Sequence, residues 1–280
     1  MSWRAQRARG KWLRAFLLVL AGVIFLAPVL WTLAASLGVM PDNSHAPPSW
    51  FASPSLEHYA EIGALTPTFA QALETGTWVA AAATGLTIVV AYLAAYALAG
   101  ARFRRRWFVV QGFLILASVP VMAYALPLLS IVRTARLYDT FVGVVAANSA
   151  GFAPLAAYIL YGYLAQVPPE LEQAARLEGA TLWQILWRVV VPLTVSGVAA
   201  TAVIVFVLNW NLLLVPMILS ETQIKTIPIL MTDFFRLERE IDWQSAAAVL
   251  TVSLAPLLAL LAVTHRLLDH FTLTAVQSIE

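Results

Sequence analysis

Six apolar runs, each close to the length of a membrane crossing, dominate this sequence and limit what it can fold into. A helix needs about 20 predominantly apolar residues to cross the hydrocarbon core of a bilayer. The runs that meet this length are 16–37, 77–99, 108–132, 141–164, 193–219 and 246–268. Only 11% of the 280 residues are charged, against about a quarter in a soluble domain. We therefore predict an all-α membrane protein with six transmembrane helices.

The basic residues predict how these helices are oriented. If the N-terminus faces the cytoplasm, most of the 17 Lys and Arg residues lie on the cytoplasmic side. The outer side then holds only Arg133, Arg136, Lys225, Arg236 and Arg239. This bias predicts that both termini are cytoplasmic. The first run is longer than the apolar segment of a signal peptide, about 7 to 15 residues, so we expect it to be retained.

The chain is predicted to divide into three parts. Residues 1–75 form a cytoplasmic segment, the first transmembrane helix and an external loop rich in Pro and acidic residues. Residues 76–270 form a core with five transmembrane helices, and residues 271–280 are a cytoplasmic tail. The run Arg102, Arg104, Arg105 and Arg106 reads as a topology signal that meets anionic lipid headgroups. A second charged external loop spans residues 220–243.

Several kinds of chemistry lack the residues they need. Without cysteine there are no disulfides, thiolate metal sites or cysteine nucleophiles. The four histidines, His45, His58, His265 and His270, show no metal-ligand spacing. No glycine-rich phosphate loop with its lysine occurs. The six runs contain no acidic residue, and secondary transporters that relay protons normally have acids there.

One polar stretch, "VPPELEQAARLEGATLWQILWRVVVP" over residues 167–192, interrupts the apolar pattern. Pro168 and Pro169 break the fourth transmembrane helix and allow a new start. Glu170 and Glu172 then lie in the first turn, where acids favour the positive end of the helix dipole. Gly179 suits the left-handed residue that ends a helix. We predict a short helix between Pro169 and Gly179.

A second helix is predicted directly after the glycine. Thr181 and Gln184 have the spacing of a capping box. An apolar stripe follows at helical spacing, formed by Leu182, Ile185, Leu186, Val189 and Val190. Trp183 and Trp187 flank it, as at a membrane surface, and Pro192 is expected to end or kink the helix. From geometry alone, a structured loop lying on lipid headgroups remains an equal alternative.

This stretch resembles the EAA loop of the permease subunits of ATP-binding-cassette importers. That pattern reads Glu-Ala-Ala, three residues, Gly, nine residues, then Ile-x-Leu-Pro. The matching residues are Gln173, Ala174, Ala175, Gly179, Val189, Val191 and Pro192. Gln173 replaces the glutamate, while Glu172 stands one position earlier. Residues 136–145 and 209–219 also look like segments of the carbohydrate-type subfamily, similar to the second maltose permease subunit.

The resemblance implies the type I importer permease fold, with a coupling helix that seats in an ATPase. The residues it assigns to this coupling are Glu170, Glu172, Gln173, Ala174, Ala175, Arg176, Glu178, Gly179, Ala180 and Pro192. It implies a non-catalytic subunit in the inner (plasma) membrane of a bacterium or archaeon. The implied partners are a homologous second permease, two nucleotide-binding subunits that hold ATP and Mg, and an external substrate-binding protein.

Polar residues within the runs are candidates for a translocation pathway. These are Asn148, Ser149, Asn209, Trp210 and Asn211. Amides and an aromatic ring suit a sugar, although such residues also make hydrogen bonds between helices. The expected cargo is a sugar or related polar solute, with glycerol-3-phosphate or an amino sugar as alternatives. A secondary transporter and a non-transporting assembly protein are the rival functions.

Overall fold

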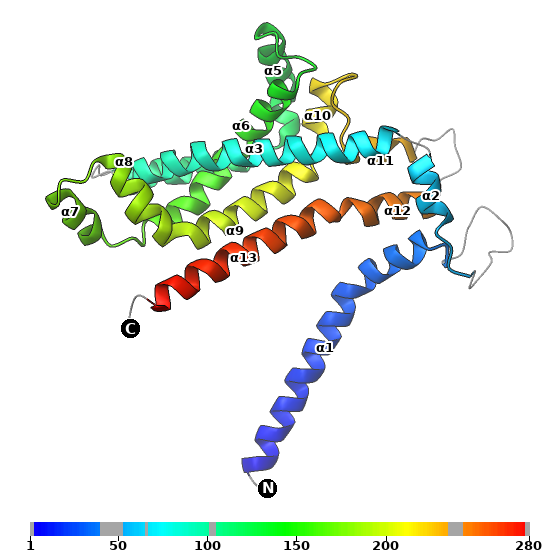
Figure 1. The fold of residues 1–280 in the computed structure, drawn as a ribbon, viewed down its shortest axis with the longest axis horizontal. Helices are drawn as coiled ribbons and strands as arrows, with labels where there is room; N and C mark the ends of the chain where they lie inside the picture. The colour runs from blue at the N-terminus through cyan, green and yellow to red at the C-terminus, as the bar shows by residue number, and fades with distance from the viewer. Residues whose placement is uncertain (1–2, 40–52, 65–66, 101–104, 235–242, 278–280) are drawn as a thin grey trace. The chain divides into compact units, whose positions relative to one another are not determined.

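The computed structural model describes residues 3–39, 53–64, 67–100, 105–234 and 243–277 (Figure 1). Every regular element in these ranges is a helix, which confirms the all-α prediction. The chain forms two compact units, one made of residues 1–70 and 231–255 and the other of residues 71–230 and 256–280.

The first unit contains α1 (Trp3–Ser36), α2 (Glu57–Ala64) and α12 (Trp243–Ser253). Helix α12 packs against both α1 and α2. The hydroxyl groups of Ser36 and Tyr59 are 2.7 Å apart and tie the end of α1 to α2. Apolar side chains of α1, such as Phe25 and Leu18, are largely exposed, as lipid-facing residues of a transmembrane helix are.

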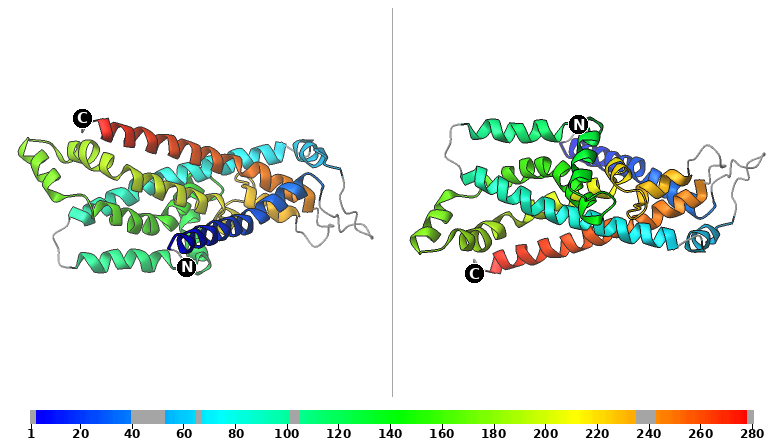
Figure 2. Two further views of the ribbon diagram at one scale, coloured as in Figure 1. Left: turned by 90° about the horizontal axis from the view of Figure 1, so that it is seen from below. Right: turned by 90° about the horizontal axis from the view of Figure 1, so that it is seen from above.

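The second unit holds the site described below. Its helices are α3 (Pro67–Gly100), α4 (Arg106–Ala117), α5 (Val121–Thr134), α6 (Phe141–Leu164), α7 (Pro169–Leu177), α8 (Leu182–Ile185), the π-helical turn η1 (Leu186–Val190), α9 (Val191–Trp210) and α10 (Leu214–Leu219). Helix α6 packs against α4 and α9 (Figure 2). Buried residues of α3, α6, α8 and α9 form one core, with Ala95, Leu160, Ile185 and Val205 among them. Three helices have residues in both units: α3, α11 (Ile227–Phe234) and α13 (Ala255–Gln277).

Five helical stretches of the described residues are long and apolar enough to cross a membrane. They are Arg14–Ser36, Thr68–Gly100, Phe141–Leu164, Leu182–Trp210 and Trp243–Arg266. Helices α4 and α5 meet at an angle of 91°. If the two are counted together as one broken span, the described residues contain a sixth candidate crossing. The span expected over 108–132 is therefore formed by two helices with a sharp bend between them. Pro120 caps α5 in an extended conformation (ψ 139°), and the residue before a proline is pushed out of helical geometry.

The fifth span also differs from its expected limits of 193–219. Pro192 does not end the preceding helix, because α8 continues through η1 into α9. A proline ring crowds the carbonyl four residues earlier, and the widened π-turn accommodates it, with the N–H of Val191 bonded to the carbonyl of Leu186. At the other end the helix stops at Trp210, and α10 is a separate short helix.

Candidate functional site

The loop between α6 and α9 folds as a helix, a glycine turn and a second helix. Pro168 is extended (φ −62°, ψ 125°) and Pro169 takes the first turn of α7, where its missing N–H costs nothing. Glu170 and Glu172 occupy the first turn and Arg176 the last. All three charges therefore have the sign that the helix dipole favours.

Gly179 closes α7 with both hydrogen bonds of a Schellman motif. Its φ is +85°, in the left-handed region that favours glycine. The N–H of Ala180 donates to the carbonyl of Ala175 at 3.0 Å, and the N–H of Gly179 donates to that of Arg176 at 3.0 Å. These bonds satisfy carbonyl groups that a helix end otherwise leaves free. The end of α7 is therefore rigidly defined.

The second helix begins with the predicted capping box. The N–H of Thr181 donates to Oε1 of Gln184 at 2.7 Å, and the N–H of Gln184 donates to Oγ1 of Thr181 at 3.4 Å. Ile185 and Leu186 are buried in the core, whereas Trp183 and Trp187 are exposed. The helix is therefore anchored by one face and leaves its indole rings at the surface.

In the described part of the chain, the outer surface of α7 is exposed. No residue of α7 is buried, and Gln173, Ala174, Glu170 and Glu178 are all exposed. Leu177, at the end of the helix, is 91% exposed. An apolar knob on a small, capped helix is suited to insertion into another protein.

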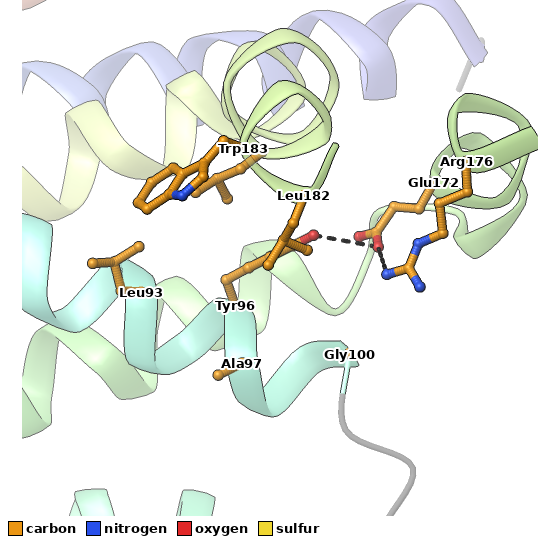
Figure 3. A pocket seen from close by; sticks show the side chains of 9 residues that line it. Leu93, Tyr96, Ala97, Gly100, Glu172, Arg176, Leu182 and Trp183 are labelled. Carbon is orange, nitrogen blue, oxygen red and sulfur yellow. Dashed lines mark hydrogen bonds and ion pairs between the residues drawn. The ribbon is translucent and has the colours of Figure 1, made fainter. Parts of the chain in front are cut away.

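The inner side of α7 carries Glu172 and Ala175, which are half-buried. The hydroxyl of Tyr96, near the end of α3, donates to Oε2 of Glu172 at 3.4 Å. The same oxygen lies 3.8 Å from Nη2 of Arg176, so the carboxylate sits between a phenol and a guanidinium (Figure 3). Glu172 thus faces inward, whereas Gln173, at the position of the motif glutamate, is exposed.

Two cavities flank this contact. One, of about 350 Å³, has apolar walls that include Leu93, Leu182 and Trp183, with Glu172 and Arg176 at its edge. The other, of about 530 Å³, lies between the ends of α3 and α6 and the start of α4, where Arg106 contributes a second guanidinium. Within the described residues, no group of three or more His, Asp or Glu side chains is placed to hold a metal ion.

The pathway candidates lie away from these cavities. Asn148, Ser149, Asn209 and Trp210 are all buried between helices of this chain. Ser149 donates to the carbonyl of Ala83 at 3.0 Å, and Nδ2 of Asn209 lies 3.4 Å from Oγ1 of Thr84. Helices α6 and α9 therefore contact α3 at two adjacent residues, Ala83 and Thr84. Asn211 lies apart, at the exposed end of α9, and bonds to the carbonyl of Val207.

Sequence reasoning missed Asp139, which joins the loop before α6 to the loop after α10. Its carboxylate accepts hydrogen bonds from the hydroxyls of Ser220 and Thr222 and from the N–H groups of Glu221 and Gln223. These bonds, chiefly the one from Ser220, hold the pKa of Asp139 well below its usual range. Asp139 has a φ of +54°, which Asp tolerates better than most residues. The run of polar residues at 220–223 was the available signal.

Some predicted features lie outside the described residues. These are Arg102, Arg104, His45, Arg236, Arg239 and residues 235–242 of the charged external loop.

Comparison with known proteins places the chain among transport proteins. Residues 87–273 match the family model of binding-protein-dependent transport system inner membrane components. The chain is 30% identical over 215 residues to the trehalose transport system permease protein SugB of Mycobacterium tuberculosis, covering 75% of this chain and 76% of that protein. It is 27% identical to the sulfoquinovosyl glycerol transport system permease protein SmoH of Agrobacterium fabrum, covering 85% and 84%.

A solved structure has the same fold. The chain is similar to a chain of a bacterial ABC transporter involved in the import of the acidic polysaccharide alginate, with a TM-score of 0.72 and 18% identity. The match covers 95% of this chain and 98% of that one.

Proposed function

Because the chain belongs to the family of binding-protein-dependent transport system inner membrane components, we propose that it is one of two homologous permease subunits in an ATP-driven importer of a sugar or related polar solute. In this proposal it works with two nucleotide-binding subunits, which hold ATP and Mg, and with an external binding protein. It lies in the inner (plasma) membrane of a bacterium or archaeon with both termini in the cytoplasm. The chain itself catalyses no reaction.

The form of α7 is the observation that carries the coupling proposal. A helix that transmits force between proteins must be short, rigid and free on its outer face. Helix α7 is stopped by a Schellman motif, followed by a capping box, and exposes Leu177, Ala174 and Gln173. We assign this face to a cleft of the nucleotide-binding subunit. Closure of two such subunits on ATP would then move α7 and rock the attached helices, as two-state transporters require.

The cargo is proposed from the relatives and from composition. SugB is named for trehalose and SmoH for sulfoquinovosyl glycerol, so a glycoside is the cargo class we favour. Ser149 and Asn209 are buried and bond to α3 in the described conformation, which favours a role in helix packing for these two side chains. The cargo class can be tested by a thermal-shift screen of the external binding protein. The screen should include glycosides, glycerol-3-phosphate and amino sugars.

Co-purification tests the assignment of the α7 surface. The importer proposal predicts that the tagged wild-type chain carries the nucleotide-binding subunit through purification. Leu177→Glu should reduce that association at least ten-fold, because it places a charge where an apolar side chain would be desolvated. Leu177 is exposed, so the fold should be unaffected.

The matched control is Leu56→Glu, which changes another exposed leucine in the predicted external loop. It should leave the association at the wild-type level. Equal recovery of the nucleotide-binding subunit with Leu177→Glu and with Leu56→Glu would contradict the assignment of this surface. Failure of the wild-type chain to retain that subunit would contradict the importer proposal itself.

A further inference from the structure

Helix α7 rests on the rest of its unit through two kinds of contact. Ala175, together with Ala180 just after the helix, packs against the core that contains Ile185 and Leu186. The second contact is polar, between Glu172 and the hydroxyl of Tyr96 on α3. Among the described hydrogen bonds of α7 side chains, this is the one that reaches a membrane-spanning helix.

The apolar contact and the polar contact differ in how strongly they restrain the motion of α7 relative to the rest of its unit. An alanine methyl presents a small, smooth surface, and apolar contacts are non-directional, so Ala175 permits α7 to rotate or slide on the core. A hydrogen bond weakens steeply when its distance or angle changes, so the Tyr96–Glu172 bond, at 3.4 Å, favours one position of α7 relative to α3 over others. The helix that Tyr96 belongs to, α3, spans residues Pro67–Gly100.

Arg176 helps to hold the Glu172 carboxylate beside the hydroxyl of Tyr96. Arg176 lies one turn after Glu172 on the same helix, 3.8 Å from the oxygen that Tyr96 contacts. Glu followed by Arg at this spacing is the favourable orientation of such a pair. Arg176 is 62% exposed, whereas Glu172 is 22% exposed. The carboxylate therefore lies between the guanidinium of Arg176 and the hydroxyl of Tyr96, as Figure 3 shows.

We propose that the Tyr96–Glu172 hydrogen bond makes α7 and α3 move as one body, with Glu172 acting as a positioning residue of the coupling loop. The inference rests on the proposed function, because it concerns how motion of α7 is passed on. The two neighbouring residues then have different roles. Gln173 belongs to the exposed surface assigned to the partner, although it also lines the larger cavity, and Glu172 connects α7 to the permease through Tyr96.

The test uses the complete importer, reconstituted with its nucleotide-binding subunits. The variants are Tyr96→Phe, Glu172→Ala and the two combined. The readout is the ratio of the ATPase rate with the solute-loaded binding protein to the rate without it. Each single variant should lower this ratio about five-fold, at the lower end of coupling between distant sites. The double variant should be no worse than either single variant, because both remove the same bond.

Two further variants separate positioning from a general loss of structure. Glu172→Gln keeps an acceptor oxygen for Tyr96 and should recover most of the ratio. Tyr161→Phe removes a hydroxyl from a partly buried tyrosine of α6 and should leave the ratio unchanged. Neither Tyr96→Phe nor Glu172→Ala should reduce co-purification of the nucleotide-binding subunit, since the outer face of α7 is untouched.

The outcomes distinguish the positioning role of Glu172 from the proposed function of the chain. A wild-type ratio in Tyr96→Phe or Glu172→Ala, additive losses in the double variant, or loss of the nucleotide-binding subunit from either single variant would overturn the positioning role. A wild-type chain that never binds the nucleotide-binding subunit would overturn the proposed function instead.

Discussion

At the scale of single residues, two glycines are required for different reasons. Gly179 is required by its backbone, because its φ is +85° although a side chain there would meet no atom within 4 Å. Gly197 is required by its neighbour, because a methyl group there would lie 2.6 Å from Cδ2 of Tyr163. The first requirement was predictable from the sequence, since a glycine before a capping box marks a helix end. The second depends on which helix packs against α9, and the sequence contains no signal for that.

The contrast between Gly197 and Gly85 gives a stability prediction. Both lie inside helices, but a methyl group at Gly85 meets no atom within 4 Å. Gly85→Ala should raise the free energy of unfolding by roughly 0.5–1 kcal/mol, because alanine loses less backbone entropy. Gly197→Ala should lower it by about 1–3 kcal/mol through overpacking. Denaturation of the purified protein in detergent measures both, and a stabilised Gly197→Ala variant would refute the described packing of α6 on α9.

Asp139 gives a prediction about pH. Its pKa is lower in the folded protein than in the unfolded chain, so its charge stabilises the fold above the unfolded pKa, near 4. This stabilisation is lost as the pH falls from there toward the folded pKa. Asp139→Asn should therefore lower Tm at pH 7, and its difference from the wild type should shrink progressively below about pH 4.

Glu221→Gln is the control for Asp139, because it neutralises an exposed carboxylate in the turn that Asp139 binds. It should change Tm little at pH 7. If the Tm difference between Asp139→Asn and the wild type were constant from pH 7 to pH 3, the hydrogen-bonded carboxylate would not be the stabilising group.

At the scale of elements, local signals predicted the coupling loop and failed at the breaks inside apolar runs. Pro169, Gly179 and the Thr181–Gln184 pair act through their own backbone neighbours, so their spacing was sufficient. Local spacing did not predict the break between α4 and α5. It also did not predict that α8 continues through Pro192. Prolines are tolerated in membrane helices when neighbouring groups satisfy the backbone, so whether a proline bends, breaks or is absorbed by a π-turn depends on tertiary packing.

The capping box provides a local prediction for α8. Thr181→Ala removes the acceptor of the Gln184 N–H and should cost about 1 kcal/mol of local stability. Hydrogen exchange measured by mass spectrometry should then be faster in the peptide that spans residues 180–185. Thr134→Ala, whose hydroxyl bonds only to the carbonyl of Ser130 in the described structure, should leave exchange in that peptide unchanged. Unchanged exchange in Thr181→Ala would contradict the capping role.

At the scale of the whole molecule, the predicted orientation can be tested because the chain has no cysteine. Single cysteines at Leu177 and Leu56, both exposed, would be unique thiols. A membrane-impermeant maleimide should label Leu56→Cys in intact spheroplasts and Leu177→Cys only after permeabilisation. Labelling of both before permeabilisation would contradict the assignment of α7 to the cytoplasm.

In the proposed mechanism, this permease moves its solute only through ATPases that act on α7. The most direct measurement is uptake, into proteoliposomes that hold ATP, of the solute that stabilises the binding protein. The complete complex should take up the solute, and no uptake should occur without ATP or without the nucleotide-binding subunits. Gly179→Pro should also abolish it, because proline cannot adopt the φ of +85° found there. Uptake that persists without the ATPase subunits, or that survives Gly179→Pro, would contradict the account.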